Sequence, residues 1–165
     1  MAGNSQLRFD LRGNLLPAKK NELTLNEFER FFVSLLPYSS RREELLEQML
    51  VLTEFIKTEL DLHFELWIDG SFVSKKREPN DIDLVLLVDY EDFNENRILL
   101  EEIFTNRVRL NWKNIDGYLL ILYPESHNFH SYTLSDKAYW YNLFTKTKMN
   151  RAEKRYDKGF VNIKF

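Results

Sequence analysis

The sequence predicts an α+β fold: a mixed β-sheet flanked by helices, with two N-terminal helices. Two capping-box spacings, each followed by apolar residues at helical intervals, predict those helices. Residues 63–69 alternate between apolar and polar side chains, as a strand with one buried face does. Residues 84–88 are apolar at every position, which is typical of a central strand with helices on both faces of the sheet.

The composition is that of an ordinary globular chain. Its 165 residues are 44% hydrophobic and 15% aromatic, enough for one domain with its own core. We expect that domain to comprise an N-terminal segment with helices (1–62), core strands (63–123) and a C-terminal helix with an edge strand (124–165). There is no cysteine, the start lacks the apolar core of a signal peptide, and no apolar run approaches the ~20 residues of a membrane helix. These features predict a cytoplasmic protein with no membrane contact.

Local signals place the remaining elements in order. Gly13 and Pro17 predict irregular structure over residues 1–22. Helices are expected over 24–36 and 40–60, the second capped at Ser40, and a further helix over 90–104. Strands are expected over 63–69, 81–89, 107–112 and 115–123. The last helix is expected to start at Ser135 or Asp136, and 160–165 to form a short edge strand.

Asp81 and Asp83 are the most informative pair of polar residues. In a strand they project from the same face, about 6.6 Å apart, while Ile82 and Leu84 enter the core on the other face. Two neighbouring carboxylates repel each other and raise each other's pKa unless a cation neutralises them. Because all their donor atoms are oxygens, the pair predicts a hard divalent ion, Mg²⁺ or Mn²⁺.

The preceding turn and loop suggest a phosphate site. Gly70 permits a tight turn with exposed backbone N–H groups, and Ser71 adds a hydroxyl. Lys75 and Lys76 follow in the loop and could contact phosphate, although an ordinary solvated loop explains them equally well. Metal, phosphate and cations would then converge on one corner, a combination that fits phosphoryl or nucleotidyl transfer.

The C-terminal region carries two further candidate features. Residues 146–165 contain seven Lys or Arg against two acidic residues, although the whole chain has a net charge of −3. This basic segment could contact phosphates, or it could be a solvated turn before the final strand. Trp140 could stack on a base, although helical spacing favours a place in the core.

Gly70-Ser71, followed after a loop by Asp81-Ile82-Asp83, resembles the motif of the polymerase-β-like nucleotidyltransferase superfamily. The chain also resembles a poorly characterised group of short, mainly bacterial nucleotidyltransferase-like proteins, over most of its length. The matching segments are LRGNLLPAKKNELTLNEFERFF, DGSFVSKKREPNDIDLVLLVD, IDGYLLILYPE, YWYNLF and KGFVNIKF.

The resemblance implies roles for individual residues. Asp81 and Asp83 match the metal-binding acids, Gly70 and Ser71 match the turn that receives the nucleotide's phosphates, and Asp116 matches a third catalytic and metal-binding acid on a later strand. In another register, Asp89 or Glu125 would take the third place.

The implied activity is transfer of a nucleoside monophosphate from an NTP to a hydroxyl of RNA, protein or a small molecule. The family setting suggests a toxin-antitoxin or phage-defence system, with a partner protein. No segment resembles a separate acceptor-binding domain, so a catalytically inactive module that binds a nucleotide or a partner stays open as the alternative.

Overall fold

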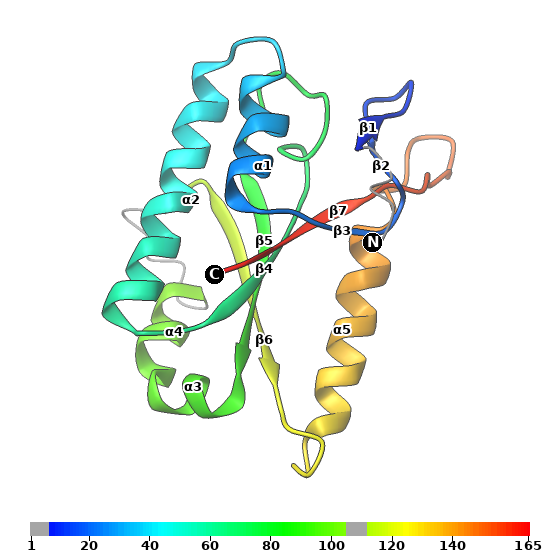
Figure 1. The fold of residues 1–165 in the computed structure, drawn as a ribbon. Coiled ribbons are helices and arrows are strands. Elements are labelled where there is room, and N and C mark those ends of the chain that lie inside the picture. Colours follow the sequence, from blue (N-terminus) through cyan, green and yellow to red (C-terminus); the bar gives the residue numbers. More distant parts are fainter. Residues whose placement is uncertain (1–6, 105–111) are drawn as a thin grey trace, which may run out of the picture.

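A computed structural model describes residues 7–104 and 112–165 (Figure 1). The helical elements are α1 (Leu25–Glu29), the π-helix η1 (Arg30–Ser34), α2 (Ser40–Glu59), α3 (Tyr90–Glu95), α4 (Arg97–Phe104) and α5 (His130–Phe144). The strands are β1 (Arg8–Phe9), β2 (Leu15–Leu16), β3 (Lys20–Glu22), β4 (Phe64–Asp69), β5 (Ile82–Asp89), β6 (Ile115–Leu122) and β7 (Phe160–Lys164). Within the described ranges, no helix combines the length and hydropathy needed to cross a membrane.

Within the described residues, five strands form a mixed sheet in the order β3-β7-β4-β5-β6. The β4–β5 and β4–β7 pairs are antiparallel, whereas β3–β7 and β5–β6 are parallel. Helices cover both faces, so the predicted α+β class with a mixed, helix-flanked sheet is confirmed (Figure 1). Strands β1 and β2 form a separate antiparallel hairpin.

The two faces of the sheet carry cores of different size. Leu84 and Leu86 of β5 belong to the larger core, which α1, η1, α2 and α4 cover. Val85 and Leu87 belong to the smaller one, which α5 covers through Phe144. Both faces of β5 are therefore buried, as its continuous apolar run predicted.

The N-terminal helical region begins as expected and then departs from regular geometry. Thr24 and Glu27 form the predicted capping box. The α-helix ends after five residues and continues as the π-helix η1, in place of one regular helix to residue 36. The cap of α2 is Ser39, one residue before the expected Ser40, because its hydroxyl accepts a hydrogen bond from the Arg42 N–H.

Two other helix predictions need correction. The helix expected over 90–104 breaks at Asn96, which caps the end of α3 before α4 begins. Helix α5 starts at His130, several residues before Ser135, because contacts with the end of β6 hold its first turn. The His130 ring bonds the Tyr123 carbonyl, and the Thr133 hydroxyl accepts from the Tyr123 N–H.

The ends of the chain meet in the sheet, contrary to two sequence predictions. Residues 160–165 were expected at an edge, but β7 lies between β3 and β4. The segment 1–22 was expected to be irregular, yet it supplies β1, β2 and β3, and β3 covers β7. Neither pairing partner is near in sequence, so no local pattern reveals it. The strand expected at 107–112 lies almost wholly outside the described residues.

A buried arginine organises the connection between β4 and β5. Arg42, on the first turn of α2, is only 1% exposed. Its guanidinium donates hydrogen bonds to four carbonyl oxygens, those of Phe32 (2.8 Å), Phe72 (2.7 Å), Ser74 (2.8 Å) and Lys76 (2.5 Å). Three of these carbonyls belong to the loop that follows Gly70 and Ser71, so Arg42 fixes the path of that loop.

Arg41 holds the far end of the same loop. Its side chain donates to the carbonyls of Pro79 (3.3 Å) and Asn80, directly before Asp81. The start of α2 therefore sets where the chain leaves β4 and where it enters β5.

Replacing Arg42 by Met is expected to destabilise the protein by about 3 kcal/mol, because the carbonyls that it satisfies would lose their charged donor. For a chain of this size the melting temperature would fall by roughly 6–12 °C. Thermal unfolding followed by circular dichroism measures this. Lys57→Met, at an exposed position of the same helix, is the control; equal melting temperatures for the two variants would contradict the assigned role of Arg42.

Candidate functional site

Three aspartates lie side by side across three neighbouring strands. Asp69 of β4 is the direct partner of Asp83 on β5, and Asp83 is the direct partner of Asp116 on β6. Partners of this kind have Cα atoms about 4.5–5.5 Å apart and side chains on the same face. Asp81 lies directly before the start of β5, two residues from Asp83, and its negative charge acts on the Asp83 carboxylate. We call these four residues the carboxylate row.

The carboxylate row lies on the face that α5 covers. Val85, two residues after Asp83, contacts the core beneath α5, and so does Trp67, two residues before Asp69. Burial decreases along the row: Asp69 is buried, Asp83 is half-buried and Asp116 is exposed. The row therefore runs from the interior to solvent.

Gly70 makes room for the carboxylate of Asp83. Its φ is +79°, and a Cβ atom there would lie 1.7 Å from Asp83 Oδ2. Its N–H stabilises the carboxylate of Asp69 by a hydrogen bond. The glycine is thus needed for the close approach of the β5 aspartate, and its N–H has a partner within the protein.

From its place just before Gly70 in the sequence, Asp69 is expected to be a strand-end or loop-bonding residue, but in the structure it is the buried end of the row. Its carboxylate forms an ion pair with the Lys158 ammonium, 89 residues away. Burial raises the pKa of Asp69 to about 6, although the positive charge of Lys158 opposes that rise. The Asp69 carboxylate is therefore mostly ionised at neutral pH.

Asp83 is the member of the row on which two other carboxylates act. Burial raises its pKa, and the negative charges of Asp81 and Asp116 raise it further. Among the described residues, the cations that lower its pKa are Lys148 and Lys158. The structure thus brings together the three acids that the sequence singled out and sets two lysines against them.

Both lysines belong to a basic hairpin between α5 and β7, residues 145–158. Backbone hydrogen bonds connect Lys158 to Thr145 (3.0 Å) and Thr147 to Tyr156 (2.9 Å). The hairpin contains six basic and two acidic residues. It lies beside the β1–β2 hairpin, where Arg12 stacks on the Tyr156 ring at 3.9 Å (Figure 1).

The structure directs the loop lysines elsewhere. The Lys75 N–H donates to the Gly13 carbonyl, and its ammonium lies 5.9 Å from the Phe9 ring centroid. The Lys76 N–H bonds the Ser74 hydroxyl, and its side chain is exposed. Lys148 and Lys158 act on Asp83 in place of the loop lysines. By sequence, Lys148 is only part of a basic segment, whereas Lys158 could either contact a triphosphate or belong to a turn before the last strand.

The strand register shows which of the three candidates for the third acid lies beside Asp83. Asp89 lies six residues beyond Asp83 on β5, or about 20 Å along the strand. Glu125 follows the end of β6, which runs parallel to β5, so it lies at that same distant end. Asp116 is the candidate placed beside Asp83.

The acids fit a hard cation in their chemistry and in their unbalanced charge. Asp81, Asp83 and Asp116 offer oxygen atoms only. The raised pKa of Asp83 reflects the burial of its negative charge and its repulsion by Asp81 and Asp116, which a divalent ion would relieve. Within residues 7–104 and 112–165, no three acidic or histidine side chains already converge as a set of metal ligands. The row would therefore have to close on the ion.

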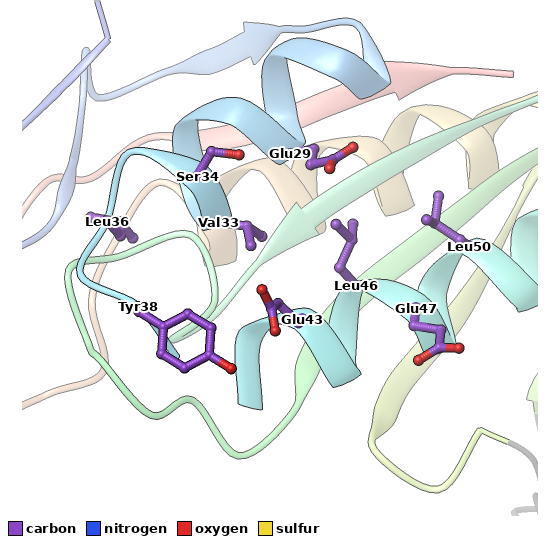
Figure 2. A pocket seen from close by; sticks show the side chains of 9 residues that line it. All are labelled: Glu29, Val33, Ser34, Leu36, Tyr38, Glu43, Leu46, Glu47 and Leu50. Carbon is purple, nitrogen blue, oxygen red and sulfur yellow. The ribbon is translucent and has the colours of Figure 1, made fainter. Parts of the chain in front are cut away.

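A hollow of about 530 Å³ lies away from the row, between η1 and α2. Figure 2 shows Glu29, Glu43 and Glu47 around it, with Leu46 and Leu50 on the side of α2. Three carboxylates at one cavity disfavour an anionic ligand, so this hollow does not suit a nucleotide.

Replacing Asp83 by Asn is expected to stabilise the metal-free protein. Because the pKa of Asp83 is raised, the folded state binds its proton more tightly than the unfolded chain, and the wild type loses stability as pH rises above about 4. Asparagine has no such dependence, so its advantage should grow with pH. We expect a rise in melting temperature of about 2 °C at pH 7 in the presence of a chelator.

The matched control is Asp89→Asn, an exposed aspartate at the other end of the same strand. Its melting temperature should change by no more than about 1 °C. A melting temperature for Asp83→Asn below that of the wild type in chelator would contradict this account of the site.

The close approach at Gly70 predicts coupling between two substitutions. Gly70→Ala should cost well over 2 kcal/mol, from the strain of its positive φ and from the overlap with Asp83. In an Asp83→Ala background only the backbone strain, about 1–2 kcal/mol, should remain. Chemical denaturation of the four proteins of this cycle measures the coupling, and strictly additive effects would show that the two residues do not interact.

Comparison with protein-family models gives one match that spans residues 7–164, from the start of the β1–β2 hairpin to the end of β7. No curated protein and no solved structure matches the chain. The matched range contains the whole carboxylate row and the basic hairpin. Because the match covers nearly the full length, the chain belongs to the family of unknown function DUF6932.

Proposed function

We propose that this chain is a metal-dependent nucleotidyltransferase that moves a nucleoside monophosphate from an NTP to a hydroxyl acceptor. One observation carries the proposal: Asp83 lies between Asp81 and Asp116, whose charges raise its pKa, and faces Lys148 and Lys158. Phosphoryl transfer needs acidic side chains that would bind a metal ion. It also needs positively charged side chains opposite them that would hold phosphate.

Asp81, Asp83 and Asp116 are the residues that would hold Mg²⁺ or Mn²⁺. The ion supplies neutralisation of phosphate charge and polarisation of the phosphorus–oxygen bonds. Lys148, which is exposed, offers an ammonium to the outer phosphates, whereas Lys158 is partly engaged by Asp69. Ser71, which lies half-buried beside Gly70, stays a predicted phosphate contact.

The exposure of Asp116 suits it to the acceptor side of the reaction. An acceptor hydroxyl approaching from solvent would meet Asp116 before the more buried Asp83. Its oxygen would attack the α-phosphorus and lose its proton to the carboxylate of Asp116, while the bond to the β-phosphate breaks and pyrophosphate leaves. RNA, protein and small molecules all offer such a hydroxyl.

A second candidate is a module on the same fold that binds a nucleotide or a partner without turnover. Two groups that would otherwise hold phosphate, the Gly70 N–H and the Lys158 ammonium, already bind Asp69. If a nucleotide binds while Asp69 still holds the Gly70 N–H and the Lys158 ammonium, the nucleotide would stay bound without reacting.

The test is label transfer. The purified protein is incubated with each α-labelled NTP in turn, Mg²⁺ or Mn²⁺, and RNA or protein extracts, and labelled products and pyrophosphate are measured. We expect label on one class of acceptor, and a rate at least about 100-fold lower for Asp83→Asn because a metal ligand is lost. Asp89→Asn, at the far end of β5, is the matched control and should retain the wild-type rate.

Binding of an NTP without release of pyrophosphate under any of these conditions would favour the inactive module. Equal transfer rates for Asp83→Asn and Asp89→Asn would place any activity outside the carboxylate row.

A further inference from the structure

Two aromatic rings adjoin the exposed end of the carboxylate row. Tyr118 follows Asp116 by two residues on β6 and therefore shares its face. Its hydroxyl lies 3.4 Å from Asp116 Oδ2, and its ring centroid lies 4.7 Å from that of Trp140 on α5. Tyr118 is 39% exposed, so solvent reaches this aromatic surface directly beside the acids.

Trp140 is held firmly by its neighbours. Its ring packs edge-on against Phe144, with centroids 5.4 Å apart, at the margin of the core under α5. Tyr139 packs edge-on against it from the solvent side. The tryptophan thus anchors the aromatic surface, while Tyr118 is the ring nearer to the acids along the chain.

We propose that Tyr118 and Trp140 form the stacking surface for the base of the nucleotide whose phosphates lie at the carboxylate row. This inference rests on the proposed function and describes how the base of the NTP substrate is recognised. Along β6, Tyr118 and Asp116 are about 6.6 Å apart, so the ring lies within the reach of a nucleotide whose phosphates are at the acids. An aromatic ring face accepts every base, so we expect only modest preference among the four NTPs.

The position of the rings favours a nucleotide over a protein partner. Exposed tyrosine and tryptophan are also common in protein interfaces. However, Tyr118 lies within contact distance of Asp116, and Lys148 acts on the neighbouring Asp83. A ligand that joins a flat apolar group to several negative charges matches this arrangement.

Calorimetric titration in Mg²⁺ with a non-hydrolysable NTP and, separately, with inorganic tripolyphosphate isolates the contribution of the base. Stacking on aromatic side chains should make the nucleotide bind about 5- to 100-fold more tightly than tripolyphosphate. Tyr118→Leu should remove most of that difference and leave the affinity for tripolyphosphate unchanged. Tyr118→Phe, which keeps the ring and loses the hydroxyl near Asp116, should restore most of the nucleotide affinity.

Two measurements guard against indirect effects. Tyr38→Leu, at a 69% exposed tyrosine beside the hollow near η1, is the matched control and should bind the nucleotide as the wild type does. Nucleotide binding should quench tryptophan fluorescence in the wild type, and Trp140→Phe should abolish the quenching while keeping an aromatic ring at the site.

The outcomes separate this inference from the function on which it rests. Equal affinities of the wild type for the nucleotide and tripolyphosphate would overturn base stacking and leave the phosphate and metal site intact. Unchanged nucleotide affinity in Tyr118→Leu would also overturn it and assign the exposed rings to a protein partner. Failure of both ligands to bind would overturn the proposed function together with this inference.

Discussion

The hydrogen bonds from the Arg42 guanidinium to four backbone carbonyls are the interaction on which the rest of the structure depends. They replace regular pairing in the loop between β4 and β5 and hold it against the start of α2. Burial lowers the pKa of Arg42 to about 10, so it stays charged at neutral pH. A charged donor in a poorly solvated position makes strong hydrogen bonds, and these fix the first part of the loop that leads to Asp81.

The end of the sheet beside this loop gathers negatively charged side chains, which repel one another. Three strands place Asp69, Asp83 and Asp116 in one line, and within residues 7–104 and 112–165 Asp69 is the one of the three that forms an ion pair with a lysine. Burial and like charge then raise the pKa of Asp83. Native proteins keep such unfavourable charge mainly where it serves a function. The basic hairpin, held by Lys158 at one end, limits this cost and brings positive charge to the place where an anion would bind.

Local patterns predicted the parts of the fold that depend on near neighbours. Asp69, Asp83 and their neighbours alternate between the two faces of the sheet because a strand has a period of two, and Thr24 caps α1 because its partner is three residues away. The interior place of β7 and the pairing of β3 could not be predicted, since their partners are distant in sequence. For the same reason the ion pair of Asp69 with Lys158 was not foreseen, and Lys148 was not assigned individually. The polar sequence around Arg42 indicated only a helix start, because the carbonyls that it binds lie in other elements.

By itself, the sequence determined which residue types could perform chemistry: paired aspartates on one strand face, a glycine at a turn, and a basic segment near the end. Each depends on the geometry of a few consecutive residues. Only the tertiary structure decided which of these residues meet. Strand register placed Asp116, and not Asp89 or Glu125, beside Asp83, and the long-range ion pair brought the basic hairpin to the acids. Register and ion pairing between distant segments depend on the packing of the whole sheet, which no local pattern contains.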